Sequence, residues 1–138
     1  MWETEHSTET DLPIEALWKT FTDIHSGKIS LPGGDVFEPE GTLAVGTRIK
    51  VTPAGQDTMT STVTEFEDNA RYADETEYNG LLLTFRHVFT PLDSGTQISH
   101  QLTITGEAAD KVGPEIGPQI SADFPDQMDA FIAVARGQ

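Results

Sequence analysis

Two histidines and a tyrosine are the side chains in this 138-residue chain whose types and spacing best suit chemistry. Tyr72, His87 and His100 belong to three successive strand-like segments, at residues 71–78, 81–90 and 96–105. Imidazole titrates near neutral pH, and a phenol can donate a hydrogen bond. Together, such groups could anchor a ligand hydroxyl or carbonyl, or move a proton during an enolisation or aldol cyclisation.

Turn chemistry predicts how these strands align. Asn79-Gly80 suits a two-residue type I′ hairpin, because both positions tolerate positive φ, and this turn pairs Tyr72 with His87. The turn at Leu92–Gly95 pairs His87 with His100. One face of the resulting sheet is apolar apart from the imidazoles, and it consists of Leu83, Phe85, His87, Phe89, Ile98, His100, Leu102 and Ile104. A polar row on such a face indicates a pocket.

The polar row need not bind a ligand, since its three side chains could simply be buried groups that hydrogen-bond one another. Asp74 shares the face of Tyr72, and a buried carboxylate needs a partner, so it either contacts Tyr72, a histidine or water, or is turned outward by a local bulge. A metal site that adds His6 is a weaker proposal, because residues along a row do not converge as in a tight three-histidine site. We therefore expect neither a metal nor another cofactor.

Composition limits the classes of function. The net charge is −15, from 23 acidic and 8 basic residues, which disfavours binding to nucleic acid and to anionic membrane surfaces. Cysteine is absent, so disulfides and thiolate zinc sites are excluded. The start of the chain lacks the pattern of a secretory signal, and no apolar stretch approaches the roughly 20 residues of a membrane span. We expect one cytoplasmic domain over residues 1–138.

The remaining periodicity predicts an α+β protein. A weak strand at 2–9 precedes a helix that has Asp11 or Leu12 at its cap and Pro13 as its first residue. Residues 25–46 are irregular apart from a short strand at Val36-Phe37. Two further strands, at 46–52 and 58–66, precede the three described above, and opposite parities of Val63 and Phe66 predict a bulge near Glu65 in the second of them. Strands bracketed by helices imply α+β rather than alternating βαβ units.

A long C-terminal helix is predicted over residues 114–136. Pro125 lies in its interior and should kink it by removing the hydrogen bond to Ser121. Such a kinked helix can lie across a strongly curved sheet. Its apolar stripe consists of Ile116, Ile120, Phe124, Met128, Phe131 and Ala135.

In this order, several segments resemble the START-like (SRPBCC) superfamily with the helix-grip fold, and within it the polyketide cyclase/dehydrase-like branch. The resemblance covers nearly the whole chain, and the segments that carry it are Thr10–Trp18, Leu43–Ile49, Thr62–Phe66, Phe89–Pro91 with Ser94–Thr96, and Leu102–Gly106. The resemblance implies a curved antiparallel sheet of about six to seven strands around the long C-terminal helix, with one or two short helices after the first strand. It also implies a cavity between helix and sheet for lipids, polyketides or other amphipathic molecules. No catalytic residue carries over by position.

We therefore predict that the cavity binds a small hydrophobic or amphipathic ligand, aromatic or polyketide-like in character. One alternative is a cyclase or dehydratase that uses His and Tyr as acid–base groups, and another is a protein-interaction module. Met59 is expected to line or fill the cavity. The predicted ligand contacts are Tyr72, Asp74, Phe85, His87, His100, Leu102, Phe124, Met128 and Phe131.

Three further predictions concern the periphery of the fold. His25 follows the first helix and could lie near the cavity mouth, although we expect it to be a solvent-exposed loop histidine. The segment Leu31–Asp35 could act as a lid, although it lacks the residues of a phosphate-binding loop. Arg86 and Glu75 should form a surface ion pair of little energetic value.

Overall fold

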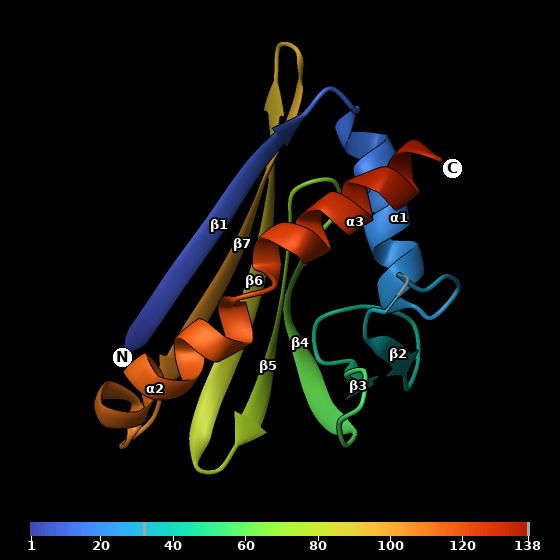
Figure 1. Ribbon diagram of the computed structural model, residues 1–138. Helices are drawn as coiled ribbons and strands as arrows, with labels where there is room; N and C mark the ends of the chain where they lie inside the picture. The colour runs from blue at the N-terminus through green and yellow to red at the C-terminus, as the bar shows by residue number, and fades with distance from the viewer. Residues whose placement is uncertain (32, 138) are drawn as a thin grey trace.

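The computed structural model describes residues 1–31 and 33–137, and Pro32 of the predicted lid lies outside the described residues (Figure 1). Within these residues, seven strands form one antiparallel sheet in the order β1-β7-β6-β5-β4-β3-β2. The strands are β1 (Trp2–Thr10), β2 (Val36–Pro39), β3 (Arg48–Thr52), β4 (Met59–Glu67), β5 (Arg71–Tyr78), β6 (Leu81–Leu92) and β7 (Gly95–Thr105). The helices are α1 (Ile14–His25), α2 (Ala109–Ser121) and α3 (Phe124–Arg136).

The helices cross the sheet in the manner predicted for a helix-grip α+β fold. Figure 1 shows α2 and α3 running across one side of the sheet, with α1 beside α3. At its start, α1 differs slightly from the prediction, because Pro13 is the N-cap in an extended conformation and Ile14 is the first helical residue. Pro at this position presets the chain for the first turn at little cost, since it has no N–H to satisfy.

The predicted alignment of the three central strands is confirmed. Tyr72 pairs with His87, and His87 pairs with His100. The first turn has the expected positive φ values, 50° at Asn79 and 80° at Gly80. In the second turn, the pairing continues to Leu92 and Gly95, so the loop is shorter than the four residues expected, although the register is unchanged.

The predicted bulge in β4 is also confirmed, and it changes the partner of Arg86. The register shifts between Val63 and Glu65, which places Glu65 opposite Ala73, and Ala73 lies opposite Arg86. Because alanine is short, Arg86 reaches over it and donates from Nε to Oε1 of Glu65 at 2.8 Å. The expected ion pair with Glu75 is therefore wrong.

The C-terminal helix begins and bends differently from the prediction. It begins at Ala109, five residues before the expected start at 114, and it is interrupted between Ser121 and Phe124. Pro125 cannot donate to the carbonyl of Ser121, so α2 ends there and Pro125 falls in the first turn of α3, where proline is tolerated. The two helices form an arm of 28 residues bent by 35°.

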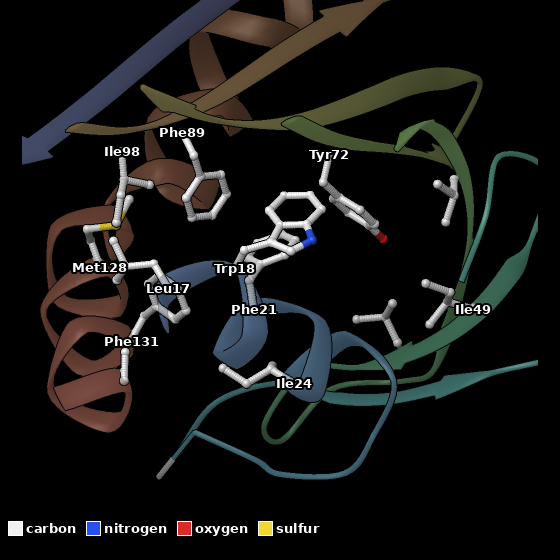
Figure 2. Close-up of a cluster of buried hydrophobic side chains, with 13 residues drawn as sticks. Leu17, Trp18, Phe21, Ile24, Ile49, Tyr72, Phe89, Ile98, Met128 and Phe131 are labelled. Carbon is white, nitrogen blue, oxygen red and sulfur yellow. The ribbon is translucent and has the colours of Figure 1, made fainter. Parts of the chain in front are cut away.

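The apolar core has two parts. Figure 2 shows the larger one, in which Leu17, Trp18 and Phe21 of α1 lie among residues of α3 and the sheet. Trp18 packs edge-on against Phe89 of β6, with ring centroids 5.3 Å apart. The smaller part lies under α2 and comprises Leu81, Leu83, Leu102, Ile104, Ala109 and Phe124.

Close packing of β1 against α2 depends on two glycines. The side chain of Trp2 lies directly over Gly113 and Gly117, which are four residues apart on α2. A Cβ atom at position 113 would lie 2.5 Å from the Cβ of Trp2, closer than real Cβ atoms approach. The absence of side chains at these two positions therefore lets the strand and the helix touch.

Candidate functional site

A cavity of about 580 Å³ lies between the helices and the inner face of the sheet. Its wall includes α1 and the segment before β2 as well as the central strands and the C-terminal arm. Seven of the nine predicted ligand contacts line it, as does Met59. The seven are Asp74, Phe85, His87, His100, Phe124, Met128 and Phe131. Their contact with a ligand remains a prediction.

The other two predicted contacts lie behind the cavity wall. Tyr72 is only 1% exposed and is enclosed by Phe21, His25 and Phe66. Its hydroxyl donates a hydrogen bond of 2.9 Å to Oδ2 of Asp74, and of the two side chains only that of Asp74 lines the cavity. Leu102 is fully buried in the core under α2. Both side chains lie on the predicted inner face of the sheet, but neighbouring side chains cover them.

Aromatic rings form a continuous column along the cavity wall, in the order Phe37, His25, Phe21, His87, His100 and Phe124. At one end, His25 lies between Phe37 and Phe21, with centroid separations of 4.4 and 4.0 Å. At the other end, His100 stacks on His87 at 4.0 Å and on Phe124 at 3.7 Å. Phe21 and His87 join the two halves at 4.8 Å. Residues from β2, α1, β6, β7 and α3 thus form one surface suited to planar or apolar molecules.

The three histidines of this column are neutral at physiological pH. Burial is the main cause, because an imidazolium loses its hydration there. It lowers the pKa of His25 to about 4 and that of His100 to about 3, and it holds the pKa of His87 well below the usual value. A neutral imidazole has one donor and one acceptor nitrogen. The column therefore offers hydrogen-bonding groups without positive charge.

Asp74 is the buried acid of the site. It is 6% exposed, and burial raises the pKa of its carboxyl to about 6, against the opposing hydrogen bond from Tyr72. The nearby charge of Asp35 raises this pKa further. A carboxyl group that titrates close to neutral pH can accept or donate a proton under mild conditions. The alternative in which a bulge turns Asp74 outward is wrong, because the bulge lies in β4.

His25 is the clearest error of the sequence-based prediction. It is the last residue of α1, is only 8% exposed and lines the cavity. Its Nδ1–H donates to the carbonyl oxygen of Phe21 at 2.9 Å, since a carbonyl can only accept. The segment after α1 folds back and places Phe37 over the imidazole, which shields it from solvent.

Some lining residues carry no signal in the sequence. Asp35 and Asp123 lie in the segments before β2 and between α2 and α3, where no periodicity indicates an orientation. Ser61 of β4 and Thr76 of β5 also line the cavity, and their hydroxyls hydrogen-bond to each other. Their strand parity could have identified them. Leu31, Gly34 and Asp35 of the predicted lid line the cavity, but lid movement remains a prediction.

His6 lies opposite His100 in the β1–β7 ladder, as the weaker metal-site proposal required. It does not line the cavity. Among residues 1–31 and 33–137, no group of three or more His, Asp or Glu side chains is arranged to hold a metal ion. Within the same ranges, no helix is long and apolar enough to cross a membrane.

Comparison with known proteins identifies the fold. No family model and no curated protein matches the sequence. Among solved structures, that of Ara h 8.0201 superposes with a TM-score of 0.77 at 15% identity, over 99% of both chains. The chain has the START-like helix-grip fold. This confirms the fold that the sequence segments suggested.

Two enzymes of biosynthesis share the START-like fold with this chain. The di-domain ARO/CYC protein StfQ from the steffimycin pathway superposes with a TM-score of 0.75 at 14% identity, over 98% of this chain and 50% of StfQ. Norcoclaurine synthase from Thalictrum flavum superposes with a TM-score of 0.70 at 14% identity, over 99% of this chain and 87% of the synthase. At these identities the likeness establishes the fold and not the activity.

Proposed function

We propose that residues 1–138 form one domain that binds a small amphipathic molecule in the cavity between the C-terminal arm and the sheet. The observation that carries this proposal is the aromatic column, which lines an interior space of about 580 Å³. A filled core would have no such space, because protein interiors are close-packed. Three START-like proteins of the same architecture, two of them biosynthetic enzymes, support a small-molecule role.

The polar groups of the cavity favour an amphipathic over a purely apolar ligand. Asp74 and His100 line the apolar wall, and each is more than nine-tenths buried. Few but well-placed polar groups in an apolar pocket typically orient a ligand. The planar part of the molecule would lie along the ring column, and its hydroxyl, carbonyl or amine would face these side chains.

Titration with N-phenyl-1-naphthylamine, an uncharged fluorescent probe, tests the proposal. We expect saturable fluorescence enhancement with a stoichiometry of about one, as one cavity of this size predicts. Ile120→Trp places a large ring in the wall formed by α2 and should abolish the enhancement. Val45→Trp, at a position 65% exposed and outside the cavity, is the matched control and should bind like the wild type. Equal binding by both variants would refute the cavity as the site.

A second candidate function is proton-transfer catalysis of the cyclase or dehydratase type, and the Tyr72–Asp74 pair favours it. Asp74 has a pKa of about 6 and lines the cavity, which are the properties of a general base. Its test is the exchange of the α-protons of 2-acetonaphthone for deuterium, followed by NMR. We expect catalysed exchange that Asp74→Asn abolishes and that Asp93→Asn, in the exposed β6–β7 loop, leaves unchanged. Exchange no faster than in buffer would argue against this role.

A further inference from the structure

The charged side chains that line the cavity are all acidic. Three carboxylates line it, those of Asp35, Asp74 and Asp123, and among its lining residues in the described ranges there is no lysine or arginine. The histidines of the wall add no positive charge, because burial keeps them neutral. A ligand that enters this cavity therefore meets acidic groups and aromatic faces but no fixed cation.

The three carboxylates form a series from the surface to the interior. Asp123, in the link between α2 and α3, is exposed, Asp35 is half-buried, and Asp74 is buried. They interact electrostatically in this order, since the charge of Asp123 raises the pKa of Asp35 and that of Asp35 raises the pKa of Asp74. Like charges that face a common low-dielectric space repel one another, and a cation between them relieves that repulsion.

Unsatisfied polar groups at the inner end of the series provide independent evidence for a bound partner. Oδ2 of Asp74 accepts the hydrogen bond from Tyr72, but Oδ1 has no partner within residues 1–31 and 33–137. Within the same part of the chain, neither ring nitrogen of His100 is hydrogen-bonded. Both side chains line the cavity and are 6% exposed. In the described part of the chain, the one fully buried side-chain polar atom without a partner is Nδ1 of His87. The unpaired atoms of Asp74 and His100 are therefore open to the cavity, where a ligand donor can reach them.

We infer that the ligand is an organic cation, a protonated amine carried on a planar or apolar body. Its ammonium group would lie between Asp35 and Asp74, where it can donate to Oδ1 of Asp74, and its body would lie along the aromatic column. Fatty acids, phosphorylated molecules and other anions would meet the same carboxylates and be repelled. This inference rests on the proposed binding function and specifies the class of ligand.

Competition among matched probes tests the inference. Naphthylethylamine, naphthylethanol and naphthylacetate share one ring system and are respectively cationic, neutral and anionic at neutral pH. Each is titrated against the bound N-phenyl-1-naphthylamine. We expect the amine to displace the probe at a concentration at least about tenfold lower than the alcohol, and the acid to be the weakest competitor. An alcohol or acid that competes as well as the amine overturns the inference, while the proposed binding function stands.

Variants that each remove one carboxylate charge test which side chains cause the preference for the amine. Asp35→Asn and Asp74→Asn keep the size of the side chains, and each should weaken amine binding by about tenfold, a much larger change than in alcohol binding. Asp93→Asn, an exposed position outside the cavity, is the control and should change neither. Amine affinity that is unchanged in both cavity variants overturns the inference. If N-phenyl-1-naphthylamine itself does not bind the wild type, the proposed function fails and the inference fails with it.

Discussion

The hydroxyl of Tyr72 donates a hydrogen bond of 2.9 Å to the carboxylate of Asp74, two residues further along β5. Strand periodicity puts both side chains on the inner face, and packing separates their roles, because Tyr72 is enclosed while Asp74 reaches the cavity. The bond stabilises the ionised carboxylate, but the loss of hydration outweighs it and raises the pKa of Asp74 to about 6. The protein therefore keeps this charge at a cost in stability.

Asp74→Asn should stabilise the protein most at neutral and alkaline pH. Between pH 3.8 and about 6, the folded state binds the Asp74 proton more tightly than the unfolded chain does, so this residue lowers the free energy of unfolding as the pH rises through that window. We expect the variant to gain about 1–3 kcal/mol near pH 8 and much less near pH 4. Urea unfolding at both pH values measures this. The same difference at the two values would contradict the assignment.

His100→Phe should reduce the loss of stability in acid. The folded pKa of His100 is about 3, so the unfolded chain binds this proton more tightly below the usual value of 6.5. The free energy of unfolding therefore falls as the pH drops from 6.5 toward 3, and one such group costs roughly 2 kcal/mol by pH 5. His100→Phe keeps an aromatic ring between His87 and Phe124. Its free energy of unfolding should no longer contain the fall between pH 6.5 and 3 that His100 causes. Phe124→Leu is the control, since it weakens the stack without removing a titrating group and should lower stability equally at pH 5 and 8.

His87→Phe should raise the free energy of unfolding at about pH 8 by roughly 1–2 kcal/mol. Nδ1 of His87 is a buried atom without a hydrogen-bond partner in the described part of the chain, and phenylalanine removes it while keeping a ring against Phe21 and His100. Urea unfolding of the ligand-free protein measures the change. A loss of stability would show that Nδ1 has a partner, such as an ordered water molecule.

Gly117→Ala should destabilise the protein by about 1–3 kcal/mol, although alanine favours the helix more than glycine does. The added Cβ would collide with the indole of Trp2, because β1 and α2 are in contact at this point. Trp2→Leu in the Gly117→Ala background should recover part of the loss. Gly137→Ala is the matched control, since its Cβ would meet only contacts of 3.7 Å, and thermal unfolding should show no loss there.

The sequence allowed the centre of the sheet to be predicted because its turns are local. Asn79-Gly80 fixes one hairpin by its own φ preferences, and the register of the next hairpin follows from the alternation of apolar residues on both sides. The pairing of Tyr72, His87 and His100 follows directly. The bulge in β4 was predictable for the same reason, as two apolar residues of opposite parity had to share a face.

The wall formed by His25, Asp35 and Phe37 could not be predicted, because it depends on contacts between distant segments. Asp35 and Phe37 come from a region without periodicity, and their positions are set by how that region packs on the end of α1. The same packing buries His25. Proline chemistry located the bend of the C-terminal arm to within a few residues, but it could not show that the helix begins at Ala109, which depends on the turn after β7.

The pairing of β1 with β7 has a consequence for synthesis of the chain. Trp2 pairs with Ile104 and Thr10 with Thr96, so β1, whose one neighbour among the described strands is β7, cannot pair until residues 96–104 have been synthesised. Until then its backbone donors and acceptors are unpaired, while the β4–β5 and β5–β6 ladders can already form. We therefore expect closure of this edge, and with it the docking of Trp2 on α2, to be a late event in folding.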